Sequence, residues 1–197
     1  SIDRHAADGY DRSLVEASDW LLYGSYALPL TLLANRQTRK DFGTISVMMA
    51  EVLLVTNDIT SITKSTTQRV RPFVYNSEAP LEDKTTKNAK LSFISGHTSN
   101  VAAMSFFTAK VISDYSDNRA LKRVTWSLAI ALPATVGFMR YQSGKHFATD
   151  VLAGYAVGAL VGYLVPALHK RKSNRLDISL APGIGQTPSQ LGMRWRF

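Results

Sequence analysis

Five apolar stretches, separated by short polar and basic joints, constrain the fold of this chain more than any other feature of its sequence. They cover residues 20–35, 42–62, 98–112, 124–139 and 151–168, and a segment at 11–18 extends the first. Their apolar residues recur at helical rather than alternating intervals. We therefore predict an all-α fold, a helical bundle of five to six main helices.

Prolines and glycines inside these stretches refine the prediction. Pro29, Pro133 and Pro166 fall within three of them, where proline is expected to kink a helix or to mark its end. The last stretch carries glycines at four-residue spacing, which lets a neighbouring helix approach closely. They are Gly154, Gly158 and Gly162. This spacing indicates tight helix packing rather than chemistry.

The periodicity changes after residue 168. The segments LDISLAPGIG and QLGMRWRF alternate as short strands do and flank a turn that contains Gly, Pro and Ser. We predict a helical domain at 1–172, followed by a C-terminal tail or short hairpin at 173–197. A chain of 197 residues is long enough for one such domain with a real core.

Composition narrows the classes of function. A net charge of +8 is typical of proteins that bind nucleic acid, an anionic membrane surface or an anionic substrate. The basic residues are dispersed and match no nucleic-acid-binding motif, so we expect no nucleic-acid partner. The chain has no cysteine, which excludes disulfides, thiolate metal sites and a cysteine nucleophile.

The polar residues that stand out lie at the ends of the apolar stretches. They are Lys64, Arg71, Ser95, Gly96, His97, Arg140, His146 and Asp150, within KSTTQRVRP, SFISGHTSN and RYQSGKHFATD. If consecutive helices alternate in direction, all of them meet at one end of the bundle, which we take as the active site. The other joints, at 36–40, 118–123 and 169–172, are basic connectors at the opposite end.

A lysine and two arginines without matching carboxylates are suited to a tetrahedral phosphate. Lys64, Arg71 and Arg140 form this set. Gly96 permits close backbone approach, and amides at the start of a helix point towards an anion, so Ser95 and Gly96 are predicted to bind a phosphate oxygen.

Two histidines make the predicted site catalytic. His146 is predicted to be a nucleophile, oriented by Asp150 four residues later on the same helix face. His97 is predicted to protonate the leaving alkoxide and later to take a proton from the attacking water. Such a scheme requires no metal, and we expect no cofactor.

These three motifs resemble the signatures of the type 2 phosphatidic acid phosphatase superfamily, shared with bacterial nonspecific acid phosphatases and vanadium haloperoxidases. The family pattern is a lysine, six residues and Arg-Pro, then Pro-Ser-Gly-His, then Ser-Arg, five residues, His, three residues and Asp. Here the motifs run from Lys64 to Asp150, and the sequence departs from them at two positions. Ile94 stands where proline is usual, and Met139 stands where a small residue is usual.

The resemblance implies a function and a set of roles. A phosphohistidine intermediate would form on His146, with His97 as the acid and base. Phosphate oxygens would be held by Lys64, Arg71, Ser95, Gly96 and Arg140. The implied activity is metal-independent hydrolysis of phosphate monoesters or diphosphates, of a lipid or of a small phosphomonoester. A vanadate-dependent haloperoxidase, with vanadate in the phosphate site, and a non-catalytic anion-binding protein remain open.

The location of the protein remains open between two alternatives. The uncharged stretch 151–168 has 18 residues, and 20–35 and 124–139 have 16 each, against about 20 for a membrane span. Ser1 opens the chain without a methionine, which indicates a processed product. The basic joints opposite the site follow the positive-inside pattern for an outward-facing site. We favour an exported, periplasmic or membrane-associated enzyme that is soluble or peripheral to the membrane, and keep a compact multi-span protein as the alternative.

Overall fold

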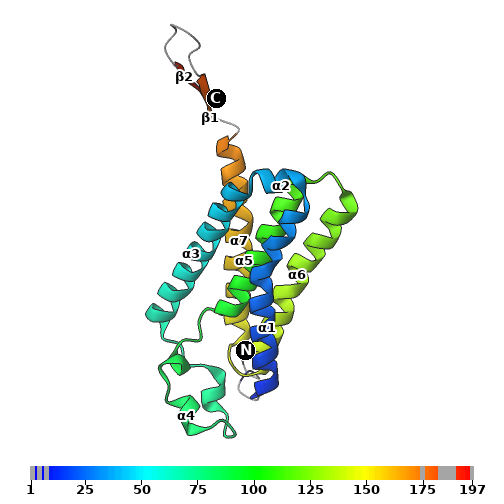
Figure 1. Ribbon diagram of the computed structural model, residues 1–197. Helices are drawn as coiled ribbons and strands as arrows, with labels where there is room; N and C mark the ends of the chain where they lie inside the picture. Colours follow the sequence, from blue (N-terminus) through cyan, green and yellow to red (C-terminus); the bar gives the residue numbers. More distant parts are fainter. Residues whose placement is uncertain (1–2, 4–5, 7–8, 174–175, 182–189, 196–197) are drawn as a thin grey trace.

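The computed structural model describes residues 3, 6, 9–173, 176–181 and 190–195, and most of them are helical (Figure 1). The α-helices are α1 (Arg12–Ala27), α2 (Arg36–Lys40), α3 (Phe42–Thr67), α4 (Leu81–Lys84), α5 (Gly96–Tyr115), α6 (Arg119–Gln142) and α7 (Ala148–Ser173). Three 3₁₀ segments join them, at η2 (Leu28–Ala34), η3 (Pro72–Tyr75) and η4 (Lys87–Lys90). The predicted all-α bundle is confirmed.

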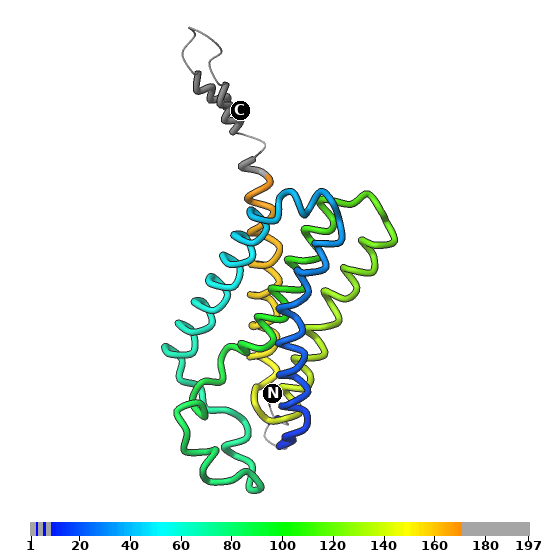
Figure 2. Tube along the Cα trace, viewed as in Figure 1, coloured from blue at the N-terminus to red at the C-terminus, as the bar shows by residue number. Residues whose placement is uncertain are grey.

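The central helix of the bundle is α5, which packs against α1, α3, α6 and α7. The five long helices alternate in direction along the chain, as the trace in Figure 2 shows. The ends of α3 and α6 therefore lie beside the starts of α1, α5 and α7. This alternation is the condition on which the predicted convergence of the polar motifs depended.

Capping residues and one proline determine several helix boundaries. Asp11 accepts the Ser13 N–H at 2.8 Å, and α1 therefore begins eight residues before the first apolar stretch. Asn118 caps α6 in the same way. Pro29 lies at the first turn of η2, immediately after α1 ends, whereas Pro133 and Pro166 lie inside α6 and α7.

The three glycines of α7 bring its backbone against α5. A Cβ on Gly154, Gly158 or Gly162 would lie 2.6, 2.0 and 2.3 Å from the carbonyl oxygens of Ser95, Ser99 and Ala103, respectively. Any side chain at these positions would overlap the backbone of α5. The close approach predicted from the four-residue spacing is confirmed, and it holds the start of α5 beside the start of α7.

Large apolar side chains cover the outside of the bundle, whereas many small polar ones are buried. The exposed apolar residues include Val47, Leu54 and Ile62 on α3, Leu128, Ile130 and Phe138 on α6, and Leu152, Leu160 and Leu168 on α7. Thr56, Thr60, Ser99 and Ser105 are buried. This pattern is typical of helices that face lipid and pack through small residues.

Two helical segments are long and apolar enough to cross a membrane, by length and composition. They are Phe42–Tyr75 and Ala148–Lys170. Together with the apolar outer surface, they support the membrane-associated alternative among those that the sequence left open.

Two short strands follow α7. Strand β1 (Leu176–Ala181) pairs antiparallel with β2 (Gln190–Trp195), with Leu176 opposite Trp195. This is the hairpin that the change of period predicted. The boundary between a domain at 1–172 and a tail at 173–197 stays a prediction.

Candidate active site

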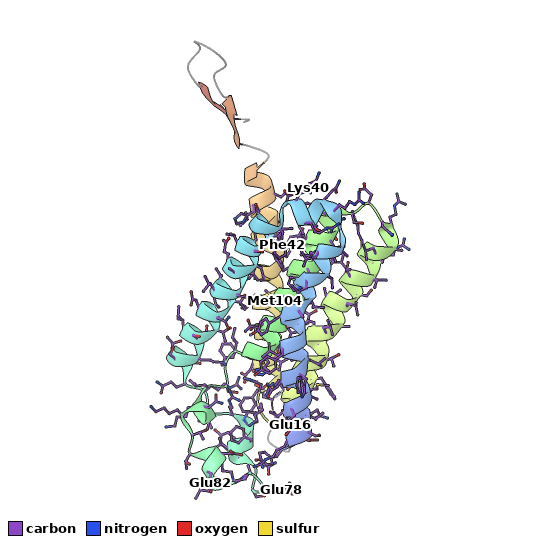
Figure 3. All side chains as sticks on the ribbon, in the orientation of Figure 1. Glu16, Lys40, Phe42, Glu78, Glu82 and Met104 are labelled. Carbon is purple, nitrogen blue, oxygen red and sulfur yellow. The ribbon has the colours of Figure 1, made fainter. Side chains whose placement is uncertain are left out.

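The predicted site residues come together at one end of the bundle, from the end of α3, the start of α5, the end of α6 and the turn before α7. In Figure 3 the labels Glu16, Glu78 and Glu82 mark this end, and Lys40 marks the opposite one. A Cβ placed on Gly96 would lie 3.2 Å from the Lys64 Nζ, so the lysine lies against the start of α5.

Two buried arginines carry donors without an acceptor. Arg71 is 8% exposed and Arg140 is 4% exposed. Arg71 donates through Nη2 to the Asn88 Oδ1 at 2.8 Å, but neither its Nε nor that of Arg140 has a hydrogen-bond partner among the described residues. Because an unpaired buried donor costs about 1–3 kcal/mol, and more when charged, these groups favour the binding of an anion.

The segment after α3 holds Arg71 in place. The Arg71 N–H donates to the Ala89 carbonyl at 2.8 Å, and the Phe73 N–H donates to the Gly144 carbonyl at 2.9 Å. Gly144 has a φ of 66°, a conformation that suits glycine, in the turn that leads to His146. The segment after α3 therefore links the first motif, at Arg71, to the third, at Gly144.

His146 is buried, 2% exposed, and its tautomer follows from its partner. Its Nδ1 lies 2.7 Å from the Ser92 carbonyl oxygen, which can only accept, so Nδ1 carries the proton and Nε2 keeps its lone pair. Burial lowers the pKa of His146 to about 3, and the nearby Arg71 and Lys64 also lower it, although Asp150 opposes the shift. The imidazole is therefore neutral at physiological pH.

Asp150 lies beside His146, but not as the sequence predicted. His146 precedes α7 rather than lying on it, and the Asp150 Oδ2 is 3.7 Å from the His146 Nδ1. The Asp150 Oδ2 accepts the Phe147 N–H at 3.0 Å, because a carboxylate in the first helical turn caps the free amide before it. It also accepts the Ser92 hydroxyl. The prediction of a shared helix face was wrong, and Ser92 supplies the direct acceptor.

Arg69 is a site residue that sequence reasoning missed. Its Nη1 donates to the Asp150 Oδ1 at 2.5 Å and to the Thr149 Oγ1 at 2.8 Å. Its Nη2 donates to the Asp3 Oδ2 at 2.9 Å, and its guanidinium lies 4.0 Å from the centroid of the Phe147 ring. Arg69 thus balances the charge of the fully buried Asp150. The only sequence signal was a second arginine two residues before Arg71.

Ser95 caps the start of α5, where its hydroxyl accepts the Thr98 N–H at 3.5 Å. The hydroxyl also lies 2.9 Å from the Thr98 Oγ1, and the Ser95 N–H donates to the Asp150 carbonyl at 3.0 Å. If Thr98 is the donor between the two hydroxyls, the Ser95 hydroxyl keeps its own proton for a phosphate oxygen. At the next position, Gly96 leaves room for the Lys64 ammonium, and the first amides of α5 have no acceptor within the helix. The predicted phosphate contacts of Ser95 and Gly96 stay predictions.

His97 and Arg140 share a carboxylate that the sequence did not indicate. The Asp19 Oδ1 lies 2.7 Å from the His97 Nε2 and also accepts from the Arg140 Nη2. Burial and Arg140 lower the pKa of His97 to about 4, while Asp19 opposes this shift. Asp19 comes from α1, more than seventy residues before the nearest motif residue on α5. Sequence spacing carried no signal for this contact.

Metal ligands do not cluster in the part of the chain that the structure describes. No group of three or more His, Asp or Glu side chains there is arranged to hold a metal ion. The side chains of Lys64, Arg71 and Arg140 lie there instead, with Arg69 beside Asp150. Metal independence stays a prediction.

The comparison with protein families covers all three motifs. A model of the PAP2 superfamily matches residues 45–174, well over half of the chain. The chain belongs to the PAP2 superfamily. The match includes every predicted site residue but begins after α1, so Asp19 lies outside it.

Two curated relatives are similar in sequence to parts of the chain. Over 79 residues, 40% of the chain, it is 35% identical to the lipid A 4'-phosphatase of Porphyromonas gingivalis. Over 117 residues, 57% of the chain, it is 30% identical to phosphatidylglycerophosphatase B of Bacillus subtilis. The matched segments span only 30% and 52% of these two relatives.

Solved structures share the fold. The transmembrane PAP2-type phosphatidylglycerolphosphate phosphatase of Bacillus subtilis superposes with a TM-score of 0.63 at 23% identity, covering 86% of this chain and 83% of that one. LpxE of Aquifex aeolicus superposes with a TM-score of 0.52 at 20% identity, covering 83% of this chain and 92% of that one. Both likenesses support the helical fold.

Proposed function

We propose that this protein is a membrane-associated lipid phosphatase that hydrolyses its substrate through a phosphohistidine on His146. The observation that carries the proposal is a buried, neutral histidine with a free Nε2, beside three cations, of which two keep unpaired buried donors. A neutral imidazole is nucleophilic, and desolvated cations bind a phosphate more strongly than solvated ones do.

The first step is attack on phosphorus. The Nε2 lone pair of His146 forms an N–P bond while the P–O bond to the leaving group breaks, and the leaving oxygen takes a proton from His97. Lys64, Arg71 and Arg140 neutralise the phosphoryl oxygens as charge develops on them. The Ser92 carbonyl and the Asp150 carboxylate stabilise the imidazolium form of His146, which the new N–P bond makes cationic.

The second step is hydrolysis. His97, now neutral, takes a proton from water as the water oxygen forms a bond to phosphorus. The N–P bond to His146 breaks, which releases phosphate and returns His146 to its neutral form. In the empty site the pKa of His97 is about 4, so the histidine must gain its proton when the substrate binds. The negative charge of a phosphate next to the ring favours this protonation. The cations carry the charge of the phosphate, so the scheme needs no metal.

A phosphorylated lipid is the substrate class that the surface favours over a small phosphomonoester. The exposed apolar faces of α3, α6 and α7 suit the interior of a bilayer, where a lipid substrate would already be located. The two curated relatives are named for lipid A and phosphatidylglycerophosphate, in agreement with this class.

Phosphate release from a panel of substrates tests the function. The detergent-solubilised protein would be assayed in EDTA with an aryl phosphate, phosphatidic acid, phosphatidylglycerophosphate and a polyprenyl diphosphate. We expect release from at least one lipid, and His146→Ala should reduce it by about 10⁴-fold or more, as loss of a central catalytic group does elsewhere. His169→Ala is the matched control, because this histidine lies near the far end of α7, where it contacts the Val165 carbonyl and Glu51.

Three outcomes would contradict the proposal. Full activity of His146→Ala would exclude the phosphohistidine, and loss of wild-type activity in EDTA would exclude metal independence. No release from any substrate, together with vanadate-dependent halide oxidation, would favour the haloperoxidase alternative. Trapping an acid-labile phosphoenzyme in the wild type, but not in His146→Ala, would support the intermediate directly.

We further propose that the site faces outward, into the periplasm or the cell exterior. The basic connectors at 36–40 and 118–123 lie at the opposite end, and clusters of Lys and Arg favour the cytoplasmic side. Because the chain has no cysteine, single cysteines can report the orientation. In intact cells, a membrane-impermeant maleimide should label Glu78→Cys, and it should label Arg39→Cys only after permeabilisation. The reverse pattern would place the site in the cytoplasm.

A further inference from the structure

The first helix contributes a carboxylate to the site. The PAP2 superfamily match begins at residue 45, whereas Asp19 lies on α1, which packs against both α5 and α6. The Asp19 Oδ1 contacts the His97 Nε2 at 2.7 Å and accepts from the Arg140 Nη2. One oxygen atom therefore links the proposed general acid to a proposed phosphate ligand.

This contact determines which nitrogen of His97 can serve the substrate. An ionised carboxylate only accepts hydrogen bonds, so the His97 Nε2 carries a proton and the ring presents Nδ1 as its second, exchangeable position. In a hydrolase triad, an aspartate on the far nitrogen fixes the tautomer and stabilises the imidazolium without being protonated itself. Asp19 has the geometry of that aspartate towards His97.

The charges around His97 make a carboxylate necessary. Arg140 from α6 and Lys64 from α3 both disfavour the imidazolium, and so does burial. Asp19 from α1 is the charged group that acts in the opposite direction. The Asp19 side chain is 40% exposed and that of Arg140 is 4% exposed, so the carboxylate also links a buried cation to the open side of the site.

We propose that Asp19 is a positioning residue, which holds His97 and Arg140 in place so that His97 can donate its proton to the leaving group. The inference rests on the proposed phosphatase function, in which His97 is the acid. It adds α1 to a site whose other proposed residues all lie within residues 64–150.

Cleavage rates for substrates with different leaving groups distinguish this role from a purely structural one. An alkoxide is a poor leaving group and needs a proton as the P–O bond breaks, whereas a nitrophenolate leaves without one. We would measure release of the leaving alcohol or phenol in the first turnover, so that hydrolysis of the phosphoenzyme does not enter. Asp19→Asn should slow alkyl phosphate cleavage by about 10²-fold, the lower end of the usual contribution of a general acid, and nitrophenyl phosphate cleavage far less.

Further variants connect the effect to His97. Asp19→Glu should recover part of the lost rate, and Asp19→Asn should add little in a His97→Ala background, because both changes remove the same function. Without the carboxylate the pKa of His97 falls, so the high-pH decline of the rate should move to lower pH in Asp19→Asn. Glu16→Gln, which removes another carboxylate from α1, should change none of these quantities, and thermal unfolding would show that each variant is folded.

Each other outcome overturns the inference. If Asp19→Asn lowers the cleavage rate equally for both substrates, and if this loss adds to that of His97→Ala, Asp19 has a structural role only. The Asp19→Asn variant could instead cleave the substrate as fast as the wild type or faster, or bind inorganic phosphate more tightly. Either result would mean that the carboxylate occupies the phosphate position and competes with the substrate. Wild-type protein that cleaves neither these substrates nor any lipid of the panel would refute the proposed function itself, and this inference with it.

Discussion

The two ends of the bundle carry similar numbers of cations, but the surroundings of these cations differ. At the site end, Arg71 and Arg140 are buried, and each keeps an unpaired Nε. At the opposite end, cations of the same types are exposed on the connectors, among them Arg36, Arg39 and Arg119. A cation in water is already satisfied, whereas one from which packing has removed water favours an anion in its place. Burial without a full set of partners, rather than charge, distinguishes the proposed phosphate site, since the buried Lys110 towards the opposite end is paired with Asp114.

Cavity size does not distinguish the two ends in the same way. A cavity of about 670 Å³ lies between η2, α5 and α6, towards the end opposite the site. Among the residues that the structure describes, no charged side chain lines it, and its walls include Leu28, Ile112 and Leu128. Such a volume could hold an apolar group but could not neutralise a phosphate. The chemistry of the lining, rather than the space, identifies the active end.

Neutralising one arginine at each end tests this comparison most strongly. Arg71→Gln should lower kcat/KM by about 10²–10³-fold, the effect of removing one transition-state donor, and Arg39→Gln should leave it unchanged. Arg71→Gln should not unfold the protein, because it relieves the burial of one cation beside others. Phosphate-release kinetics and thermal unfolding in detergent would be measured for both variants. Equal kinetic effects at the two ends would contradict the comparison.

A second pair of variants compares cations by their partners. Arg69→Gln removes the partner of the fully buried Asp150 and should cost about 2 kcal/mol of stability, below the usual cost for a buried pair because Arg69 is itself 32% exposed. Arg12→Gln removes an exposed arginine 3.7 Å from Asp83 and should cause no measurable change. Thermal unfolding of both proteins gives the comparison. A stable Arg69→Gln variant would show that Asp150 does not depend on this charge.

The smallest expected effect is proton uptake on anion binding. Sulfate is a tetrahedral dianion at every pH from 5 to 8, so it does not titrate itself. Because the pKa of His97 is about 4 in the empty site, the ring is neutral there, and a bound dianion should raise this pKa and draw in less than one proton. Calorimetry in two buffers of different ionisation heat measures the uptake, which should increase as the pH falls.

His97→Asn should abolish that uptake. His146 is neutral in the empty site too, with a pKa of about 3, so uptake that persists in His97→Asn would assign the proton to His146 instead. Uptake that does not depend on pH would contradict the linkage altogether.

Several features of the fold could be predicted because they depend on nearby residues. Helix positions follow from local apolar periodicity, and the glycines at 154, 158 and 162 indicate close packing, which α5 and α7 confirm. The start of α1 agrees with the predicted extension of the first stretch to residues 11–18, and the Asp11 carboxylate caps the helix there. The relation of His146 to Asp150 was predicted wrongly, because four-residue spacing implies a shared face only inside a helix.

The sequence by itself determined the helical plan and the set of motif residues, but their meeting at one end depended on the alternation of helix direction, which the structure supplied (Figure 2). Tertiary structure alone decided which groups touch them: the Ser92 carbonyl on His146, Arg69 on Asp150, and Asp19 on both His97 and Arg140. Periodicity and motif spacing are properties of neighbouring residues, and so they can be recognised along the chain. A contact between a carboxylate on α1 and a histidine on α5 depends on how separate helices pack, which no local pattern specifies.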